Sequence, residues 1–570
     1  MNLWPVLILA AGLLAYGGSL WGPFVFDDRL HLVDETRLQH LWPIGELIGK
    51  SIRPVADLTF AVNYALGGTN VFRYHLFNLA IHLGAGCMLF GILRRTFLTY
   101  RLKKRYGKMA SSLSGAAALL WVVHPLNTQA VMYVIQRAEL LMGFFYLSTL
   151  YCLIRFAGEP RKGFWKTGAI ACCALGMGSK AIMVTAPAVV FLYDAVFLAG
   201  SWKETFRQRG GLYGGLAATW GILLWMLVPL SRGEDISVGA SVPGVTAVSY
   251  ALTQPEVILH YVRLSFWPQP LVFDYNWPIV RGMSAALLPG LLIGGLLGIT
   301  LFALRQGWPA GFLGAWFFGI LAPTSSFFPI ADCAFEYRVY LSLVSICAGM
   351  VVTGYEVLKR VFGSREALAR MVAAGMVVVG VGVFSGMTIG RHFDYKTEVT
   401  LWQDTVRKRP GNWRAQHNLG RALEREEKLE EAIQSYRQAI RLKPDSVQAY
   451  NSLGATLARQ GKGEEAIESY RHALGIDPNA ADVHSNLGVA LGRLGRVEEA
   501  RKEFEEAIRI NPNAADAHNN LGMALGQLGR LEEAREEFEK AIGIEPDNAS
   551  YRRNLATALE MLGRRKGEIH

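Results

Sequence analysis

The feature that most constrains the fold is a repeat in the last third of the chain. Proline recurs every 34 residues from Pro410 to Pro546, and alanine keeps the same period from Ala432 to Ala534. A Leu-Gly pair and an aromatic residue share this period, at Leu419-Gly420, Leu453-Gly454, Leu487-Gly488, Leu521-Gly522, Tyr436, Tyr470, Phe504 and Phe538. A sustained period of this length predicts stacked units of two helices each, in which small residues allow close approach and proline ends each unit.

This pattern is the signature of tetratricopeptide repeats. We expect four repeats over residues 411–546, followed by a capping helix and tail over residues 547–570. Such a solenoid has a concave face suited to extended peptides. Asparagines near the starts of the first helices either clamp the backbone of an acceptor peptide or are surface and capping residues; they are Asn418, Asn451, Asn486 and Asn520.

The chain before residue 391 has the character of a membrane domain. Hydrophobic residues make up 51% of the sequence and its mean hydropathy is +0.22. Apolar runs long enough to span a bilayer, some of them short or tilted, occur at 3–20, 75–93, 109–123, 139–156, 165–178, 182–199, 212–230, 285–304, 308–322, 338–358 and 371–390. The sequence therefore predicts an all-α chain, with a polytopic membrane domain over 1–390, a connector over 391–410, and the solenoid.

Charge predicts the orientation of this domain. Residues 411–570 carry a net charge of −3 and the remainder +14, so the basic excess lies in the membrane half. That distribution argues against a nucleic-acid partner. If the N-terminus is cytoplasmic, the densely basic loops all fall on the cytoplasmic side, as the positive-inside rule expects; they are 94–108, 155–166, 203–209 and 359–370.

All four basic loops lie on the cytoplasmic side only if the short apolar stretch Val257–Trp267 does not cross the membrane. We therefore interpret this stretch as re-entrant or interfacial. The first run lacks a basic n-region and a cleavage site before Asp27, which predicts a retained helix rather than a signal peptide. The loop 21–74, the other outer loops and the repeat domain then face an extracytoplasmic space. Compact loops and a short N-terminus favour a bacterial inner membrane, with the repeats in the periplasm.

Polar groups gather on the predicted outer face. Asp27 and Asp28 stand where the first helix meets water, a costly position that suggests a functional site. The simpler alternative is a pair of solvated loop acids or a helix cap. Further acids, cations and polar residues follow in the same loop and in, or at the borders of, the other outer loops: Arg53, His124, Arg137, Glu139, Lys180, Asp274, Tyr275, Glu336 and Arg338.

These residue types fit the transfer of a group carried on a lipid phosphate. Arg137, Lys180 and Arg338 would neutralise the phosphate leaving group, and Asp27 or Asp28 would accept a proton from an attacking hydroxyl. The other outer residues would bind the substrate. Each cation taken singly could equally be an interfacial anchor.

No cofactor is predicted with certainty. The chain has no Gly-rich phosphate loop on a strand–helix unit, no His-Glu-x-x-His motif, and no cysteine spacing typical of a disulfide framework. His31, Asp34 and Glu35 are compatible with a divalent cation, although their spacing is not diagnostic.

The order of motifs in the membrane half resembles that of the transmembrane and tetratricopeptide-repeat-containing (TMTC-type) O-mannosyltransferases, multispanning glycosyltransferases of the GT-C fold. The residues that carry the resemblance are Asp27-Asp28, Arg53-Pro54, Leu58, Asn63-Tyr64, Tyr74-His75, Asn78, His124-Pro125, Thr128, Ala130-Val131, Arg137-Ala138-Glu139-Leu140, Ser179-Lys180, Trp267-Pro268, Pro270-Leu271, Asp274-Tyr275 and Thr400-Leu401-Trp402. Two positions depart from the family pattern: Ala181 follows Lys180 where an acid is expected, and Tyr337 separates Glu336 from Arg338.

The resemblance implies a polyprenyl-phosphate-linked sugar, typically mannose, transferred with inversion to Ser or Thr of a translocated protein. It places the base among the first-loop acids, with Asp27 preferred. We therefore expect a membrane glycosyltransferase whose repeats bind the acceptor protein or peptide. Two alternatives stay open: a lipid-linked glycan ligase or polymerase acting on a glycan or lipid, and a non-enzymatic scaffold that anchors the repeats.

Overall fold

The computed structural model describes residues 3–49, 51–159, 161, 163–230, 245–280 and 282–567. Its regular elements are helices throughout these ranges, which confirms the all-α prediction. The chain divides into two compact units, Met1–Leu401 and Trp402–His570, and each is described by itself. Part of the predicted outer loop 231–284, residues 231–244, lies outside the described residues.

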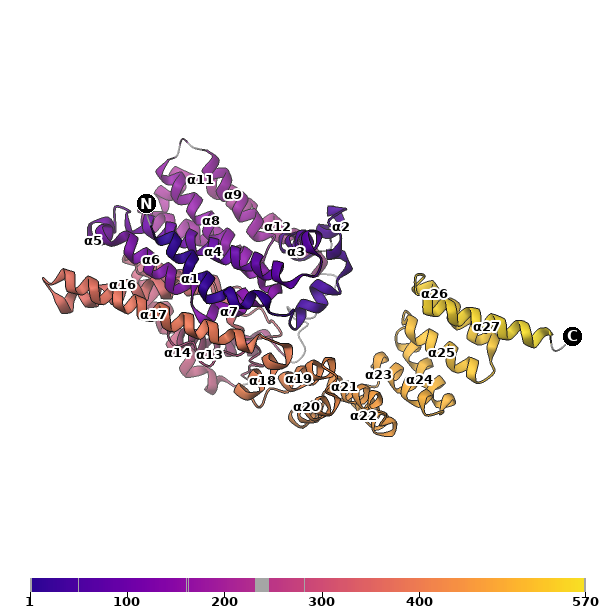
Figure 1. The fold of residues 1–570 in the computed structure, drawn as a ribbon. Coiled ribbons are helices and arrows are strands. Elements are labelled where there is room, and N and C mark those ends of the chain that lie inside the picture. The colour runs from indigo at the N-terminus through magenta and orange to yellow at the C-terminus, as the bar shows by residue number, and fades with distance from the viewer. Residues whose placement is uncertain are drawn as a thin grey trace. The chain divides into compact units, whose positions relative to one another are not determined.

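The first unit is a bundle of helices of very different lengths (Figure 1). Short 3-10 or π turns join them, among them η2 (Arg29–Val33), η6 (Val134–Gln136) and η9 (Glu336–Val339). The helices are α1 (Trp4–Tyr16), α2 (Ile44–Gly49), α3 (Pro54–Gly67), α4 (Val71–Phe97), α5 (Lys103–Tyr106), α6 (Ala110–Val122), α7 (Thr128–Met132), α8 (Arg137–Gly158), α9 (Phe164–Met177), α10 (Ala186–Tyr193), α11 (Trp202–Ala218), α12 (Trp220–Leu230), α13 (Ala247–Phe266), α14 (Met283–Arg305), α15 (Gly311–Leu321), α16 (Leu343–Phe362) and α17 (Glu366–Asp394).

Among the described residues, six helical segments are long and apolar enough to cross a membrane, or seven if one bent pair is counted as a single span. A helix overlaps each of the eleven apolar runs in the sequence. The centre of the unit is formed by α4 packed against α6 and α8, with α1 against α4 and α6. Small residues permit this packing, because a Cβ on Gly86 or Gly115 would collide with Val122 or Trp4.

The segment expected to be re-entrant is the second half of a longer helix. Helix α13 begins at Ala247, ten residues before the predicted Val257, and it contains Pro255. A capping box at Thr246 and Ser249 starts the helix, a local signal that hydropathy alone does not detect. Side chains and carbonyls along α13 contact residues 124, 324 and 335, all in predicted outer loops.

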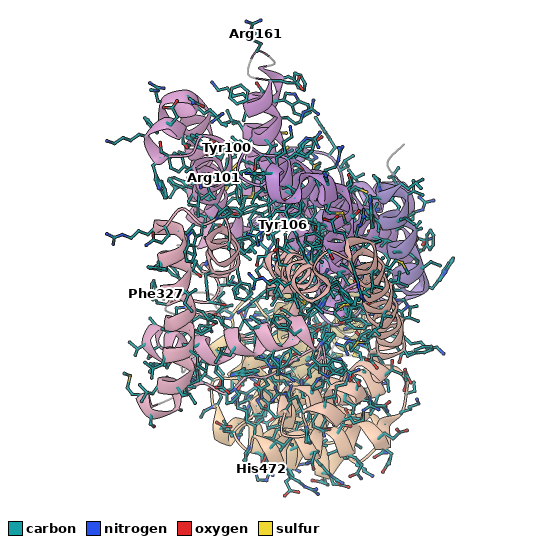
Figure 2. The ribbon with its side chains drawn as sticks, turned by 90° about the vertical axis from the view of Figure 1, so that its left-hand side faces the viewer. Tyr100, Arg101, Tyr106, Arg161, Phe327 and His472 are labelled. Carbon is teal, nitrogen blue, oxygen red and sulfur yellow. The ribbon has the colours of Figure 1, made fainter. Side chains whose placement is uncertain are left out.

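Contacts between loops occur at two ends of the first unit. At the basic end, which Figure 2 marks by Tyr100, Arg101 and Tyr106, the Arg101 guanidinium donates to the carbonyls of Gly307 (2.8 Å) and Gly200 (3.5 Å). At the other end, the Val55 N–H donates to the Gly178 carbonyl (3.0 Å). The Arg101 bonds join loops assigned to one side, and the Val55 bond joins the first loop to the end of the run 165–178.

The second unit is an array of helix pairs that follow one another along the chain (Figure 1). Helix α18 (Glu398–Lys408) begins in the first unit and leads into this one. The pairs are α19 (Trp413–Arg425) with α20 (Leu429–Leu442), α21 (Val447–Arg459) with α22 (Gly463–Ile476), α23 (Ala481–Arg493) with α24 (Val497–Ile510), and α25 (Ala515–Gln527) with α26 (Leu531–Ile544), and α27 (Ala549–Gly567) follows.

The repeated Leu-Gly and aromatic positions meet inside each pair. A Cβ added to Gly488 would lie 2.6 Å from Cε1 of Phe504, well inside van der Waals contact. We expect Gly488→Ala to destabilise the repeat unit by about 1–3 kcal/mol through overpacking. Gly526→Ala is the matched control, because nothing lies within 4 Å of its Cβ position. Hydrogen exchange of the repeat helices in the full chain checks this, and equal protection in both variants would contradict it.

Candidate functional site

The two acids of the first loop have different settings. Asp28 is fully buried, and its carboxylate accepts backbone N–H bonds from Val25 (3.1 Å), Val134 (3.4 Å) and Ile135 (2.8 Å). Burial raises the pKa of Asp28 to about 8, although the three N–H donors oppose the shift. Asp28 therefore joins the first loop to the start of α8.

Asp27 is half-buried and lies beside the hydroxyl of Tyr133. Burial, with a contribution from the two neighbouring carboxylates, raises the pKa of Tyr133 well above its usual range. A phenol that keeps its proton is a hydrogen-bond donor. The preceding residue, Phe26, has φ 51°, a left-handed conformation that is uncommon for a bulky side chain and is often found at functional sites.

A cationic cluster lies at the turn after α9. The Lys180 ammonium donates to Oε2 of Glu139 (2.6 Å) and lies 4.6 Å from the centre of the Tyr337 ring. Burial lowers the pKa of Lys180, Glu139 opposes this shift, and Arg53 adds to it. The second oxygen of Glu139, Oε1, is buried and has no hydrogen-bond partner among the described residues. An unsatisfied buried acceptor is a position that a ligand hydroxyl can occupy.

The turn that presents Arg53 is held by a short network. The Arg53 N–H donates to Oγ of Ser51 (2.8 Å), whose hydroxyl donates to Asp57 (2.6 Å), and Asp57 also accepts from Arg37 (3.2 Å). Within the described ranges, the guanidinium of Arg53 makes no hydrogen bond or ion pair. Arg53 thus offers an unengaged cation beside Lys180.

Arg137, expected to bind phosphate, is instead fully buried among protein groups. Its guanidinium donates to Oδ1 of Asn78 (2.8 Å) and to the carbonyls of Thr59 (3.1 Å) and Tyr74 (3.1 Å). It also lies 4.3 Å from the centre of the Phe60 ring. This setting joins α3, α4 and α8 and leaves little of the guanidinium for a ligand.

Arg338 has a similar setting. Its guanidinium donates to the carbonyls of Asp332 and Cys333 (3.0 Å) and, at 3.4 Å, to the hydroxyl of Tyr250. It therefore holds the loop before η9.

Glu336, Tyr275 and Asp274 belong to a neighbouring buried group. Glu336 accepts from the Tyr275 hydroxyl (3.0 Å) and from the Val272 N–H, and its other oxygen lies 3.7 Å from the Arg391 guanidinium. Asp274 accepts from the Asn276 N–H (2.8 Å) in a local turn. These contacts shape the chain around residues 271–276.

His124 is buried and organises the break between α6 and α7. Its Nδ1 accepts from the Leu126 N–H (3.2 Å), and Nε2 lies 3.1 Å from the Ser265 carbonyl. Both ring nitrogens are therefore engaged within the protein.

Gln129 connects the acid loop to the cationic cluster. Its side chain donates to the Phe273 carbonyl (2.8 Å) and accepts from the Tyr337 N–H (3.2 Å). The Phe273 ring lies 5.2 Å from that of Tyr133, beside Asp27. The sequence prediction did not assign Gln129, Tyr133 or Tyr337 a role, and the only signal was the position of Tyr337 between Glu336 and Arg338.

The asparagines of the repeats differ among themselves. Asn486 donates to Asn451 (2.9 Å), and Asn451 donates to Asp482 (3.0 Å), so these amides join successive repeats. Asn520 accepts one long bond, 3.5 Å, from Asn519. Asn418 is partly exposed on α19.

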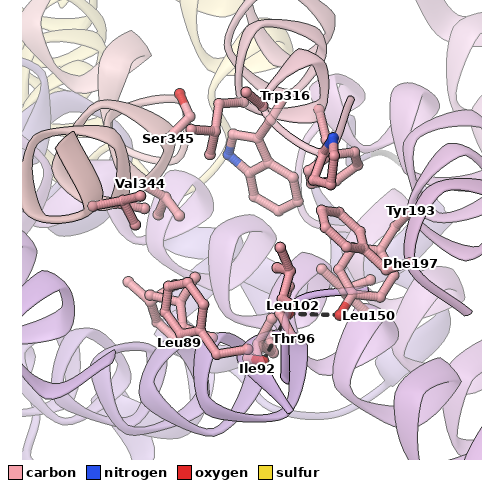
Figure 3. Close-up of a pocket in the computed structure, with 18 of the residues that line it drawn as sticks. Leu89, Ile92, Thr96, Leu102, Leu150, Tyr193, Phe197, Trp316, Val344 and Ser345 are labelled. Carbon is pink, nitrogen blue, oxygen red and sulfur yellow. Dashed lines mark hydrogen bonds between the residues drawn. The ribbon is translucent and has the colours of Figure 1, made fainter. Parts of the chain in front are cut away.

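The described residues contain no group of three or more His, Cys, Asp or Glu placed to hold a metal ion. A cavity of about 170 Å³ lies elsewhere in the first unit, among α4, α8, α15 and α16, and is lined almost entirely by apolar side chains such as Leu89 and Trp316 (Figure 3). Its polar groups are paired, as in the bond between Thr96 and Tyr193 (2.6 Å). It contains none of the predicted site residues.

Comparison with known proteins bears on both units. Tetratricopeptide-repeat models match residues 485–549, 420–461 and 457–495. The protein O-mannosyl-transferase Tmtc3 of Drosophila melanogaster is 26% identical over 511 residues, which cover 76% of this chain and 54% of that protein. The protein O-mannosyl-transferase TMTC4 of Homo sapiens is 26% identical over 482 residues, covering 74% of this chain and 64% of that protein.

The chain resembles the TMTC protein O-mannosyltransferases. This confirms the family resemblance expected from the motifs, and the repeat models confirm the tetratricopeptide array. The chain spans between half and two thirds of the length of these relatives. Among solved structures, the MamA protein is 25% identical over 27% of this chain and 84% of its own, with a TM-score of 0.25.

Proposed function

We propose that the chain is a membrane glycosyltransferase that moves a sugar, mannose or another hexose, from a polyprenyl phosphate to Ser or Thr hydroxyls of extracytoplasmic proteins. The observation that carries the proposal is the chain of contacts from the half-buried Asp27, beside Tyr133, through Phe273 and Gln129 to the cluster of Arg53, Lys180 and Glu139. A base and a phosphate-binding cluster on one face are what this transfer requires. The similarity to O-mannosyltransferases supports the reaction class.

In the proposed reaction, Asp27 accepts the proton of the acceptor hydroxyl as that oxygen attacks the anomeric carbon of the sugar. The bond between this carbon and the phosphate oxygen breaks, and its electron pair leaves with the polyprenyl phosphate. Attack opposite to the leaving group inverts the anomeric centre. The leaving phosphate monoester anion needs no proton, so no general acid is required.

Arg53 and Lys180 are proposed to neutralise the phosphate, with Arg53 supplying bidentate donors and Lys180 a point charge. Oε1 of Glu139, which has no hydrogen-bond partner among the described residues, is proposed to accept a bond from a sugar hydroxyl. Arg137 and Arg338, whose donors are engaged by the protein, are proposed to hold the surrounding loops. Asn418 and Asn520, whose side chains make at most one long hydrogen bond within the described residues, are proposed to contact the acceptor, whereas Asn451 and Asn486 join repeats.

The same-side contacts between loops support the proposed topology of eleven spans, with the N-terminus in the cytoplasm and the repeats outside. Arg101 donates hydrogen bonds to two loops that this topology assigns to the inside, and α13 contacts residues 124, 324 and 335, which it assigns to the outside. We propose a bacterial inner membrane as the location.

The direct test uses the full chain reconstituted in lipid vesicles with polyprenyl-phosphate mannose and a Ser/Thr-rich peptide. A gain of one hexose mass on the peptide is expected. Transfer only from a polyprenyl-diphosphate oligosaccharide would overturn the proposed donor. Sugar appearing on glycan or lipid instead of peptide would overturn the proposed acceptor, and absence of transfer in every combination would favour a scaffold.

Arg53 provides a prediction for donor binding. We expect Arg53→Gln to raise the KM for the lipid-phosphate donor about tenfold to a hundredfold, because it removes a charge-assisted contact to phosphate. Thermal stability should stay near wild type, since the guanidinium has no protein partner in the described ranges. Initial-rate kinetics check this, with Arg73→Gln as the control cation outside the cluster. An unchanged donor KM would remove Arg53 from the phosphate site.

A further inference from the structure

The backbone of Phe26 is held by a residue far along the chain. The Phe26 N–H donates to Oε1 of Glu398 at 3.2 Å, across 372 residues of sequence. Phe26 has φ 51°, and a left-handed conformation costs free energy for a residue with a large side chain. The surrounding contacts must therefore stabilise this conformation.

The side chain of Phe26 is also held in place. Its ring lies 6.0 Å from that of Phe273 in an edge arrangement. Phe273 in turn packs against Tyr133 (5.2 Å), beside Asp27, and against Tyr395 (5.9 Å), just after α17. The junction between α17 and α18 thus contacts Phe26 through Glu398 and supports its aromatic neighbour through Tyr395.

Glu398 occupies a well-defined position. It is the first residue of α18, and Thr397 and Thr400 exchange hydrogen bonds across this helix start (2.9 and 3.0 Å). Thr400 also donates to the carbonyl of Asp394 at the end of α17 (3.2 Å). The carboxylate that contacts Phe26 therefore comes from a helix start fixed by its own hydrogen bonds.

We propose that Glu398 is a positioning residue, which holds Phe26 in its left-handed conformation and thereby sets the direction of the Asp27 carboxylate. This assignment rests on the proposed function of Asp27 as the base.

The test compares Glu398→Ala, Glu398→Gln and the control Gln403→Ala, which changes an exposed residue of the same helix. In the vesicle assay, Glu398→Ala should lower kcat about tenfold with the donor KM unchanged, because misplacement of a reacting group affects mainly the chemical step. Glu398→Gln keeps an acceptor oxygen and should stay within about threefold of wild type. A loss in Glu398→Gln equal to that in Glu398→Ala would overturn the positioning role.

A double-mutant cycle tests the conformational step. Glycine adopts positive φ at little cost, so in a Phe26→Gly background Glu398→Ala should lower kcat by less than about threefold. An equally large loss in both backgrounds would overturn the proposal.

Hydrogen exchange of residues 22–30 in the full chain keeps the test independent of activity. Glu398→Ala should speed exchange of the Phe26 amide, whereas Glu398→Gln and Gln403→Ala should not. If wild type transfers no sugar, the proposed function fails but exchange still decides whether Glu398 holds the loop. Unchanged exchange in Glu398→Ala would overturn the proposal.

Discussion

Asp27→Asn is expected to lower sugar transfer at least about a hundredfold while the protein folds normally. The amide cannot accept the proton of the acceptor hydroxyl, and loss of a general base typically costs this much or more. Asp27 is half-buried and is not the acid that anchors the loop, so its replacement by an isosteric amide should leave the fold intact. Hexose mass on Ser/Thr peptides, measured at matched protein level, checks the result.

The control for this prediction is Glu35→Gln, which changes another acid of the same loop. It should retain wild-type transfer. If Asp27→Asn transfers sugar as fast as wild type, Asp27 is not the base. If both variants lose transfer together, the loss reports a general effect on the loop.

Asp28→Asn is expected to destabilise the first unit by on the order of 3 kcal/mol. The Asp28 carboxyl, which its raised pKa keeps mostly protonated near neutral pH, uses both oxygens to accept the N–H groups of Val25, Val134 and Ile135, because a protonated carboxyl retains acceptor capacity. An amide replaces one oxygen with a donor that would face those N–H groups and leave at least one of them unsatisfied. Thermal unfolding of the purified full chain checks this, and an unfolding temperature equal to that of Asp27→Asn would contradict it.

The raised pKa of Asp28 makes the folding stability depend on pH. Burial raises it to about 8, against about 4 for an unfolded Asp. Between these values the unfolded chain has released the proton that the folded chain retains, so the unfolded state binds fewer protons and stability falls as pH rises from about 4 to 8. The contribution of protonated Asp28 to the free energy of unfolding is complete below about pH 4 and lost above about pH 8. In Asp28→Asn this fall of stability between about pH 4 and 8 should be absent, as thermal unfolding measured across that pH range would show.

Together, the two variants separate chemistry from folding. Both should reduce transfer in cells, but only Asp28→Asn should reduce the unfolding temperature. The sequence could not make this distinction because adjacent acids in a loop have the same local pattern. Their roles differ because the chain turns at Phe26. Asp28 then accepts the N–H groups that precede α8, whereas Asp27 lies beside Tyr133.

The cations show the same limit. From the sequence, Arg137, Lys180 and Arg338 were all predicted to bind the phosphate, because all three are cations at one predicted membrane face. In the structure Arg137 donates to Asn78 and to carbonyls of α3 and α4, whereas Lys180 pairs with Glu139 beside Arg53. Whether a guanidinium is available to a ligand depends on partners that are distant in sequence, and residue type does not report them.

By itself, the sequence determined the features that arise from local periodicity. The 34-residue repeat predicted the helix pairs, and long apolar runs predicted the apolar helices of the first unit, because helical period and hydropathy are properties of neighbouring residues. Only the tertiary structure decided that Asp28 anchors the loop, that α13 begins at Ala247, and that Glu398 contacts Phe26. Those outcomes depend on which backbone groups meet after folding, and pairing between segments hundreds of residues apart leaves no periodic signal in a single sequence.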